Sequence, residues 1–281
     1  MTRSWSRSIK LACAIALALA APASAQAPAD PRPPLMVMGT VPIYWGEAAD
    51  FSDLLNGGGD PHWARALLER GFVLVPLDTL DPAQLAANGT HLLMAQPRTL
   101  SAAENVALDN WVRGGGHVLL FADPLMTGES RFGIGDRRRP QDVALLSPLL
   151  THWGLDLQFD DDQLLGVVSG NAGVAQLPVN VPGRLAALPG GSCVALGDGL
   201  AARCALGAGE ALVVADAAVL DHAGPWPGAK AGLAALLESI FPGAAEHLGD
   251  FGESPDQLDV NGGILPFSDS AGPPAEMSHD P

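Results

Sequence analysis

The side chains best suited to hold a ligand fall mainly in two segments of the 281-residue chain, both of which we expect to be loops. The candidate ligand-binding residues are Tyr44, Trp45, Glu47, His62, Gln96, Asp123, Arg131 and Arg137. A set of this kind could bind a sugar or a peptide without reacting with it. Alternatively, Glu47, His62 and Asp123 could serve as acid–base groups of a hydrolase that acts on such a ligand.

The triplet Arg137-Arg138-Arg139 is the only dense cluster of positive charge in the chain, whose 15 basic and 31 acidic residues give a net charge of −16. Guanidinium groups suit bidentate binding of a carboxylate or another anion. The same triplet could instead be a solvated loop whose arginines pair with nearby carboxylates. The overall acidity argues against binding of nucleic acid or of anionic lipid.

The usual motifs of catalysis and cofactor binding are missing. No Gly-x-Ser-x-Gly elbow occurs, and no cysteine follows an expected core strand as a nucleophile. Asp160-Asp161-Asp162 lacks the spaced ligands of a calcium loop and is typical of a turn. Five histidines show no paired metal-ligand spacing: His62, His91, His117, His152 and His222. The sequence therefore predicts no catalytic residue, no metal and no cofactor.

The first 25 residues have the features of a secretory signal. Basic residues, including Arg3 and Lys10, precede the apolar run from Leu11 to Ala21, and Ala23-Ser24-Ala25 supplies a cleavage pattern. The apolar run is shorter than the roughly 20 residues that span a bilayer. We expect export to the periplasm of a bacterium or beyond it, a Pro-rich leader over 26–34, and no stable membrane insertion after cleavage.

Cys193 and Cys204 flank a predicted hairpin turn centred on Asp198-Gly199. In that hairpin, paired positions share one sum, since 197 + 200 = 397 and 193 + 204 = 397. The two cysteines therefore face each other, and in an oxidising compartment we expect a structural disulfide between them. The alternative is two unrelated small hydrophobic residues.

Short apolar runs alternate with amphipathic helices in the first half of the chain. A helix should begin at Asp60-Pro61 and end at Gly71, and another should begin with the capping box of Ser101 and Glu104 and bury Ala103, Ala107 and Trp111. This alternation predicts an α/β fold with a doubly wound, mostly parallel sheet. The expected strands are 35–38, 72–75, 91–95 and 118–122.

The second half predicts a β-rich antiparallel elaboration over about 157–215 of the same domain, which we expect to extend from 35 to 242. A last helix over Ala229–Phe241 should end at Pro242. Residues 243–281 carry eight acidic and no basic residues, which predicts a disordered acidic tail. The short strands of the elaboration are expected at Leu164–Val168, Val174–Leu177, the cysteine hairpin and Ala211–Ala215.

Several blocks of the sequence resemble the GldG-like domains found with uncharacterised ABC-type transport systems. One runs from Leu92 to Pro97, and a second runs from Trp111 to Pro124, where a helix ends in Gly-Gly and the next strand ends in Asp-Pro. The segments Leu149-Leu150, Trp153-Gly154-Leu155 and Asp216–Leu220 also resemble that family, so that the resemblance covers about 35–241.

The GldG-like resemblance implies a flavodoxin-like fold of the class I glutamine amidotransferase superfamily. That superfamily carries a nucleophilic cysteine in the turn after a core strand, whereas the matching turn here, after Ala95, has Gln96-Pro97. We therefore expect an exported, non-catalytic binding or scaffolding module, with an envelope or transport protein as its partner. A periplasmic hydrolase, or a binding protein for a sugar or peptide, is the alternative.

Overall fold

The computed structural model describes residues 32–47, 61–221, 224–244 and 248, which belong to a compact unit that begins at Arg32. The expected signal sequence and the acidic tail beyond Leu248 lie outside the described residues. Within the described ranges, no helix has the length and apolar character needed to cross a membrane.

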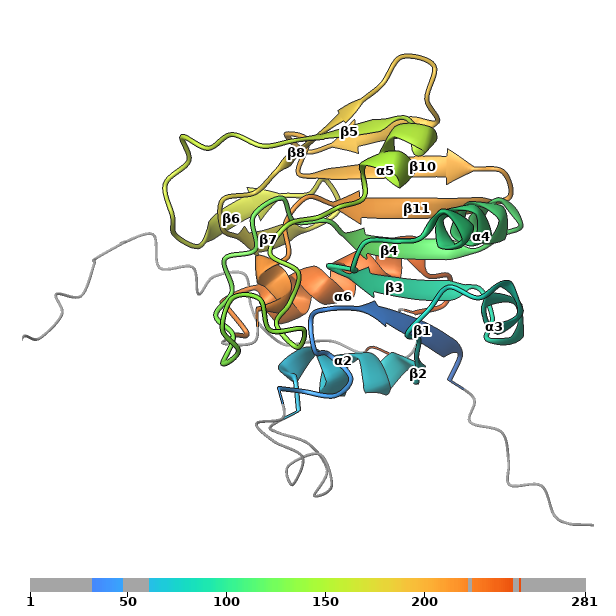
Figure 1. Cartoon of the computed structure of the whole chain (residues 1–281), viewed down its shortest axis with the longest axis horizontal. Helices are drawn as coiled ribbons and strands as arrows, with labels where there is room; N and C mark the ends of the chain where they lie inside the picture. Colours follow the sequence, from blue (N-terminus) through green and yellow to red (C-terminus); the bar gives the residue numbers. More distant parts are fainter. Residues whose placement is uncertain (1–31, 48–60, 222–223, 245–247, 249–281) are drawn as a thin grey trace, which may run out of the picture. The chain divides into compact units, whose positions relative to one another are not determined.

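A seven-stranded sheet with the order β2-β1-β3-β4-β11-β10-β9 forms the centre of the fold (Figure 1). Its first five strands run parallel, and β10 and β9 run antiparallel to their neighbours. This order of parallel strands is one of the two common doubly wound arrangements. The strands are β1 (Pro34–Gly39), β2 (Val73–Pro76), β3 (His91–Ala95), β4 (His117–Phe121), β9 (Cys193–Leu196), β10 (Ala201–Leu206) and β11 (Gly209–Val214).

Helices cover both faces of the sheet, and each face has its own hydrophobic core. On one face α2 and α6 pack against strand residues such as Leu93 and Leu119. On the other, α3, α4 and α5 pack against residues such as Leu92 and Leu120. The doubly wound α/β fold is thus confirmed. The helices are α2 (Trp63–Gly71), α3 (Pro82–Ala87), α4 (Ala102–Arg113), α5 (Ser147–Trp153), the 3-10 helix η1 (Ala218–Leu220) and α6 (Ala229–Ile240).

Two small antiparallel sheets form the predicted elaboration. They pair β5 (Leu155–Gln158) with β8 (Arg184–Ala187), and β6 (Val168–Asn171) with β7 (Gln176–Val179). Two expected strands of this region need correction. The segment expected at Ala211–Ala215 corresponds to β11, which pairs antiparallel with β10 as expected but also belongs to the main sheet through its parallel pairing with β4. Residues 164–167 form no strand, and β6 begins only at Val168.

The expected helix starts are partly confirmed. The capping box of Ser101 and Glu104 is present at the start of α4, but Ala103 is exposed. The stripe that faces the core follows Leu108 and Val112, which lie one turn apart. Helix α2 begins at Trp63 and not at the expected Asp60-Pro61, because the ring of His62 accepts the hydrogen bond from the Ala64 N–H and caps the helix.

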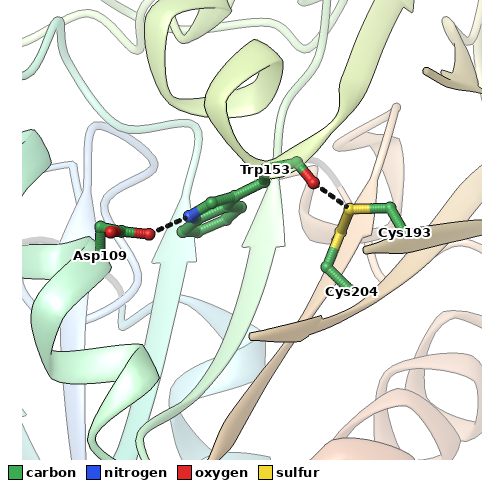
Figure 2. Close-up of a disulfide and its surroundings, with 4 residues drawn as sticks. All are labelled: Asp109, Trp153, Cys193 and Cys204. Atoms are coloured by element: carbon green, nitrogen blue, oxygen red, sulfur yellow. Dashed lines mark hydrogen bonds between the residues drawn. A yellow bond between two sulfur atoms is a disulfide. The ribbon is translucent and has the colours of Figure 1, made fainter. Parts of the chain in front are cut away.

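A disulfide joins Cys193 on β9 to Cys204 on β10, and the two residues are register partners as their spacing predicts. The Sγ atom of Cys193 lies 3.1 Å from the carbonyl oxygen of Trp153 (Figure 2), and this is a sulfur–oxygen contact because a disulfide sulfur has no proton to donate. The indole Nε1 of Trp153 donates to Asp109 Oδ1 at 3.0 Å. The edge of the sheet is thereby linked through α5 to α4.

Candidate functional site

The crevice between the carboxyl ends of β1 and β3 is where a sheet of this order commonly binds ligands. Here the two strands are in close contact at that point. A Cβ atom on Gly39 would lie 2.0 Å from the carbonyl oxygen of Ala95, so only glycine fits. The Thr40 N–H donates to the carbonyl oxygens of both Ala95 and Gln96 at 3.1 Å. The crevice is therefore closed by direct backbone contact.

The side chain of Gln96 fills the turn after β3, where φ is +46° and the residue is fully buried. Its Nε2 donates to the carbonyl oxygens of Asp123 (2.9 Å) and Gln141 (3.0 Å), and its Oε1 accepts from the Asp123 N–H (2.8 Å). All three bonds go to the backbone of the segment that follows β4. Gln96 therefore joins two loops of the carboxyl edge, and its amide is already satisfied within the protein.

Asp123 and Asp216 follow the adjacent strands β4 and β11 and are both buried. The carboxylate of Asp123 accepts from the N–H groups of Leu125 (2.9 Å) and Ala217 (3.0 Å). That of Asp216 accepts from the N–H groups of Asn180 (3.0 Å) and Ala218 (2.7 Å). These bonds tie the loops after β4 and β11 to each other and to the segment after β7.

Burial shifts the titration of both members of this carboxyl pair. It raises the pKa of Asp123 to about 6, although two backbone N–H groups favour the ionised form. Burial, together with the nearby Asp123 charge, raises the pKa of Asp216 well above its ordinary value. Residues with such shifts are candidates for acid–base chemistry, but both carboxyls are nearly inaccessible and bound to backbone N–H groups.

Glu47 and Arg131 join the loop after β1 to the loop after β4. Ser130 Oγ donates to Glu47 Oε1 at 2.6 Å, and the Arg131 N–H donates to Glu47 Oε2 at 3.1 Å. The guanidinium of Arg131 donates in turn to the Glu47 carbonyl oxygen at 2.8 Å. The structure thus brings two of the candidate residues together in a contact between loops.

His62 lies at the start of α2, and both of its ring nitrogens bind the backbone. Nδ1 accepts from the Ala64 N–H, and Nε2 lies 2.9 Å from the Leu220 carbonyl oxygen. Since Nδ1 is an acceptor, the proton is on Nε2. The ring therefore connects α2 to η1.

A cavity of about 440 Å³ opens beside the carboxyl ends of β1 and β2, on the other side of β1 from the closed crevice. Its walls come from the loops after β1, β2 and β4. The lining residues are Val37, Gly39 to Pro42, Tyr44 to Gly46, Pro76 to Asp78, Phe132, Arg137 and Arg138.

Three aromatic rings in the lining are fixed by their neighbours. Tyr44 meets the 63% exposed Trp45 edge-on at 4.7 Å, and the guanidinium of Arg65 lies 4.6 Å from the centre of the Tyr44 ring. Phe132 is buried and carries the guanidinium of Arg138 at 4.1 Å from its centre. The cavity therefore offers ordered aromatic surface next to positive charge.

The three arginines of the triplet differ in whether they have an ion-pair partner. Arg138 pairs with Asp136 at 2.7 Å, and this contact raises the pKa of Arg138 and lowers that of Asp136 to about 2. Arg139 pairs with Asp142 at 2.9 Å. Arg137 lines the cavity and makes no hydrogen bond or ion pair with any residue in the described ranges. One arginine of the three is thus available to a ligand.

The candidate residues therefore separate into those at the cavity and those inside the protein. Tyr44, Trp45 and Arg137 line the cavity, whereas the other five are bound to neighbouring loops or helices. Phe132 and Asp78 are lining residues that the sequence analysis missed. Phe132 could have been found as the aromatic residue next to Arg131 in an expected loop. Nothing in the sequence marks Asp78.

No family model and no curated protein match this chain. Solved structures with a similar arrangement include the mmIFT52 N-terminal domain (15% identity, TM-score 0.39, 66% of this chain and 86% of that chain). A cytoplasmic protein from Salmonella typhimurium (11%, 0.43, 74% and 98%) and a β-galactosidase from Rahnella sp. R3 (13%, 0.41, 74% and 31%) are also similar. The chain spans about a third of the length of that galactosidase. The fold and the cavity together define a doubly wound α/β protein with a lined opening at its carboxyl edge.

Proposed function

We propose that this protein is a non-catalytic binding module that holds a small acidic sugar or peptide in the cavity beside β1 and β2. The observation that carries the proposal is Arg137, which lines the cavity without a partner among the described residues. A guanidinium in this position can receive a carboxylate in a bidentate bond.

The remaining walls fit the same ligand class. Tyr44, Trp45 and Phe132 offer apolar ring faces against which a sugar ring or an apolar side chain can pack. Asp78 adds an acceptor for hydroxyl or ammonium groups. A volume of about 440 Å³ lies in the range of small-molecule pockets, roughly 300–1,000 Å³.

Hydrogen bonding at the carboxyl edge favours binding over hydrolysis. Glu47, His62 and Asp123, the residues that a hydrolase would use, are bound to neighbouring groups and do not line the cavity. A general acid or base must reach the proton it transfers, within about 3 Å or through one water. These three side chains would have to leave their present partners to do so.

Titration calorimetry with glucuronate and with the dipeptide Ala-Asp tests the proposal. We expect Arg137→Gln to weaken binding about 10-fold or more, because a hydrogen bond to a charged group contributes about 1.5–3 kcal/mol. Arg184→Gln is the matched control, since it removes an exposed arginine outside the cavity. Equal affinities of the two variants, or no binding of either probe by the unaltered protein, would contradict the proposal.

A second proposal concerns a partner protein. Leu164 and Leu165, between β5 and β6, are 91% and 76% exposed, and Val168, the first residue of β6, is 60% exposed. Neighbouring exposed apolar residues of this size are typical of contact surfaces, and the GldG-like resemblance suggests an envelope transport component as the partner. Leu164→Asp with Leu165→Asp should abolish its recovery after crosslinking in envelope extracts. Val106→Asp, a change at another exposed apolar position on α4, should not.

We also propose that the chain is exported. The disulfide between Cys193 and Cys204 supports this, since such bonds persist in oxidising compartments. Mass spectrometry of the protein from periplasmic extracts should find a mature amino terminus at Gln26. An uncleaved chain recovered only from the cytoplasm would contradict export.

A further inference from the structure

Two histidines lie side by side at the amino ends of adjacent parallel strands. His91 begins β3 and His117 begins β4, and the two are register partners. Register partners on neighbouring strands point to the same face of a sheet, and their ring centres are 6.4 Å apart. This pair lies at the opposite ends of the strands from the cavity.

The Nδ1 atoms of both rings are buried and have no hydrogen-bond partner in the part of the chain that the structure describes. His91 is only 8% exposed. Leaving a buried polar atom unpaired costs about 1–3 kcal/mol, and each such atom in a native protein calls for an explanation, of which a bound ion is one. A single ion bound between the two neighbouring rings would explain both unpaired atoms.

The ring of His91 is held with this nitrogen free. Phe72 and Phe241 pack around the ring at 6.0 and 5.0 Å between centres. The Nδ1 atom of His91 is thus a nitrogen without a hydrogen-bond partner among the described residues.

Among the described residues, the carboxylate nearest in register to the pair already has a partner. Glu210 on β11 is the register partner of His117, but it pairs with Arg203 of β10, which also donates to the Ser239 carbonyl oxygen. Among the described residues, the only group of three close metal-ligating side chains is the exposed run Asp160-Asp161-Asp162. The histidine pair thus offers two unpaired Nδ1 atoms as nitrogen ligands.

We propose that His91 and His117 bind a single Cu⁺ ion through their Nδ1 atoms. Imidazole nitrogens suit copper, and a monovalent ion that accepts two ligands in line needs no carboxylate to balance its charge. Zn²⁺ takes four ligands, which the pair does not provide. With metal–nitrogen bonds of about 2 Å and ring atoms about 1.2 Å from the ring centre, one bridging ion places the centres roughly 6 Å apart. The 6.4 Å separation of the ring centres leaves room for one such ion between Nδ1 atoms that face each other.

Anaerobic titration of the full chain with Cu⁺, in competition with bicinchoninate, tests the proposal. We expect one equivalent of ion per chain, and a loss of affinity of about 100-fold in both His91→Phe and His117→Gln. His152→Gln is the matched control, because its side chain is 59% exposed on α5, and it should bind as the unaltered protein does. Retained affinity in either of the first two variants would overturn the proposal.

X-ray absorption of the unaltered protein loaded with Cu⁺ needs no variant and guards against misfolding of His91→Phe. Two nitrogen neighbours in line are expected, and four neighbours or any sulfur neighbour would contradict the site. The ion should also raise the Tm of the unaltered protein but not that of His117→Gln, since a ligand stabilises only the form that binds it. Zn²⁺ that displaces Cu⁺ from the pair, or a crystal structure with only a water between the two rings, would equally overturn the proposal.

Discussion

Buried polar side chains at the two ends of the parallel strands differ in how completely they are hydrogen-bonded. At the carboxyl ends, Gln96, Asp123 and Asp216 make hydrogen bonds to backbone groups with every side-chain oxygen and nitrogen. At the amino ends, His91 and His117 each leave one nitrogen unpaired. A fully satisfied polar group holds loops in place, whereas an unsatisfied one is a better indication of a ligand. The cavity fits this distinction, because its accessible arginine is the one without a local carboxylate.

The largest effect on stability should come from Gln96→Ala. The substitution removes three hydrogen bonds and leaves the Asp123 N–H and the Gln141 carbonyl oxygen without these partners, whereas the Asp123 carbonyl oxygen keeps the Ala144 N–H. We expect a loss of about 3–5 kcal/mol in the free energy of unfolding, measured by urea denaturation. Gln84→Ala, at an exposed position of α3, should change it by less than about 0.5 kcal/mol. Similar values for the two variants would show that Gln96 does not hold the loops together.

The carboxyl pair should make the protein less stable as the pH rises. For Asp123, a folded-state pKa of about 6 lies above the ordinary 3.8, so the folded state holds a proton that the unfolded state has lost. The proton contributes about 3 kcal/mol to the free energy of unfolding, at 1.36 kcal/mol per pKa unit. This contribution is complete below about pH 4 and declines as the pH rises through about 6.

Comparison with Asp123→Asn isolates this effect. His91 has a lowered pKa and therefore contributes in the opposite direction over part of the same range, but it does so in both proteins. Urea denaturation between pH 4 and 7.5 should show a smaller decline with rising pH in Asp123→Asn than in the unaltered protein. The same slope of stability against pH in both proteins would mean that the pKa of Asp123 is not raised in the folded state. Asp156→Asn, at an exposed position of β5, should leave the slope unchanged.

Loss of the disulfide should have a smaller effect. Replacing Cys193 and Cys204 with alanine opens a short loop, which corresponds to about 2–3 kcal/mol of stability. Dithiothreitol should reduce the Tm of the unaltered protein and leave that of the double variant unchanged. A Tm that responds equally to the reductant in both proteins would contradict a stabilising disulfide.

The smallest effect is expected for Glu47→Gln. The amide keeps one acceptor for Ser130 or Arg131 but loses the charge, and we expect a loss of about 1 kcal/mol in stability with no change in ligand affinity. Calorimetry with glucuronate, alongside urea denaturation, separates the two outcomes. A marked loss of affinity without a loss of stability would place Glu47 in the ligand site after all.

Local patterns predicted much of the fold. Strand β3 was predicted at its observed bounds, and the cysteine pairing followed from the turn, because both depend on residues close together in the chain. The closeness of Asp123 to Asp216, and of His91 to His117, depends on which strands become neighbours and in what register. The absence of paired histidine spacing along the chain therefore gave no information about neighbouring strands. Similarly, β11 was expected in the antiparallel region because nothing local distinguishes a strand that pairs with β4.

A nuclear magnetic resonance titration of ¹⁵N-labelled protein with glucuronate and with Ala-Asp tests ligand binding at the cavity most directly. We predict that the indole N–H of Trp45 and the guanidinium N–H of Arg137 shift and saturate together, while the side-chain amide of Gln96 keeps its position. Saturating shifts centred on Gln96 and Asp123, with Trp45 and Arg137 unchanged, would contradict the proposed site.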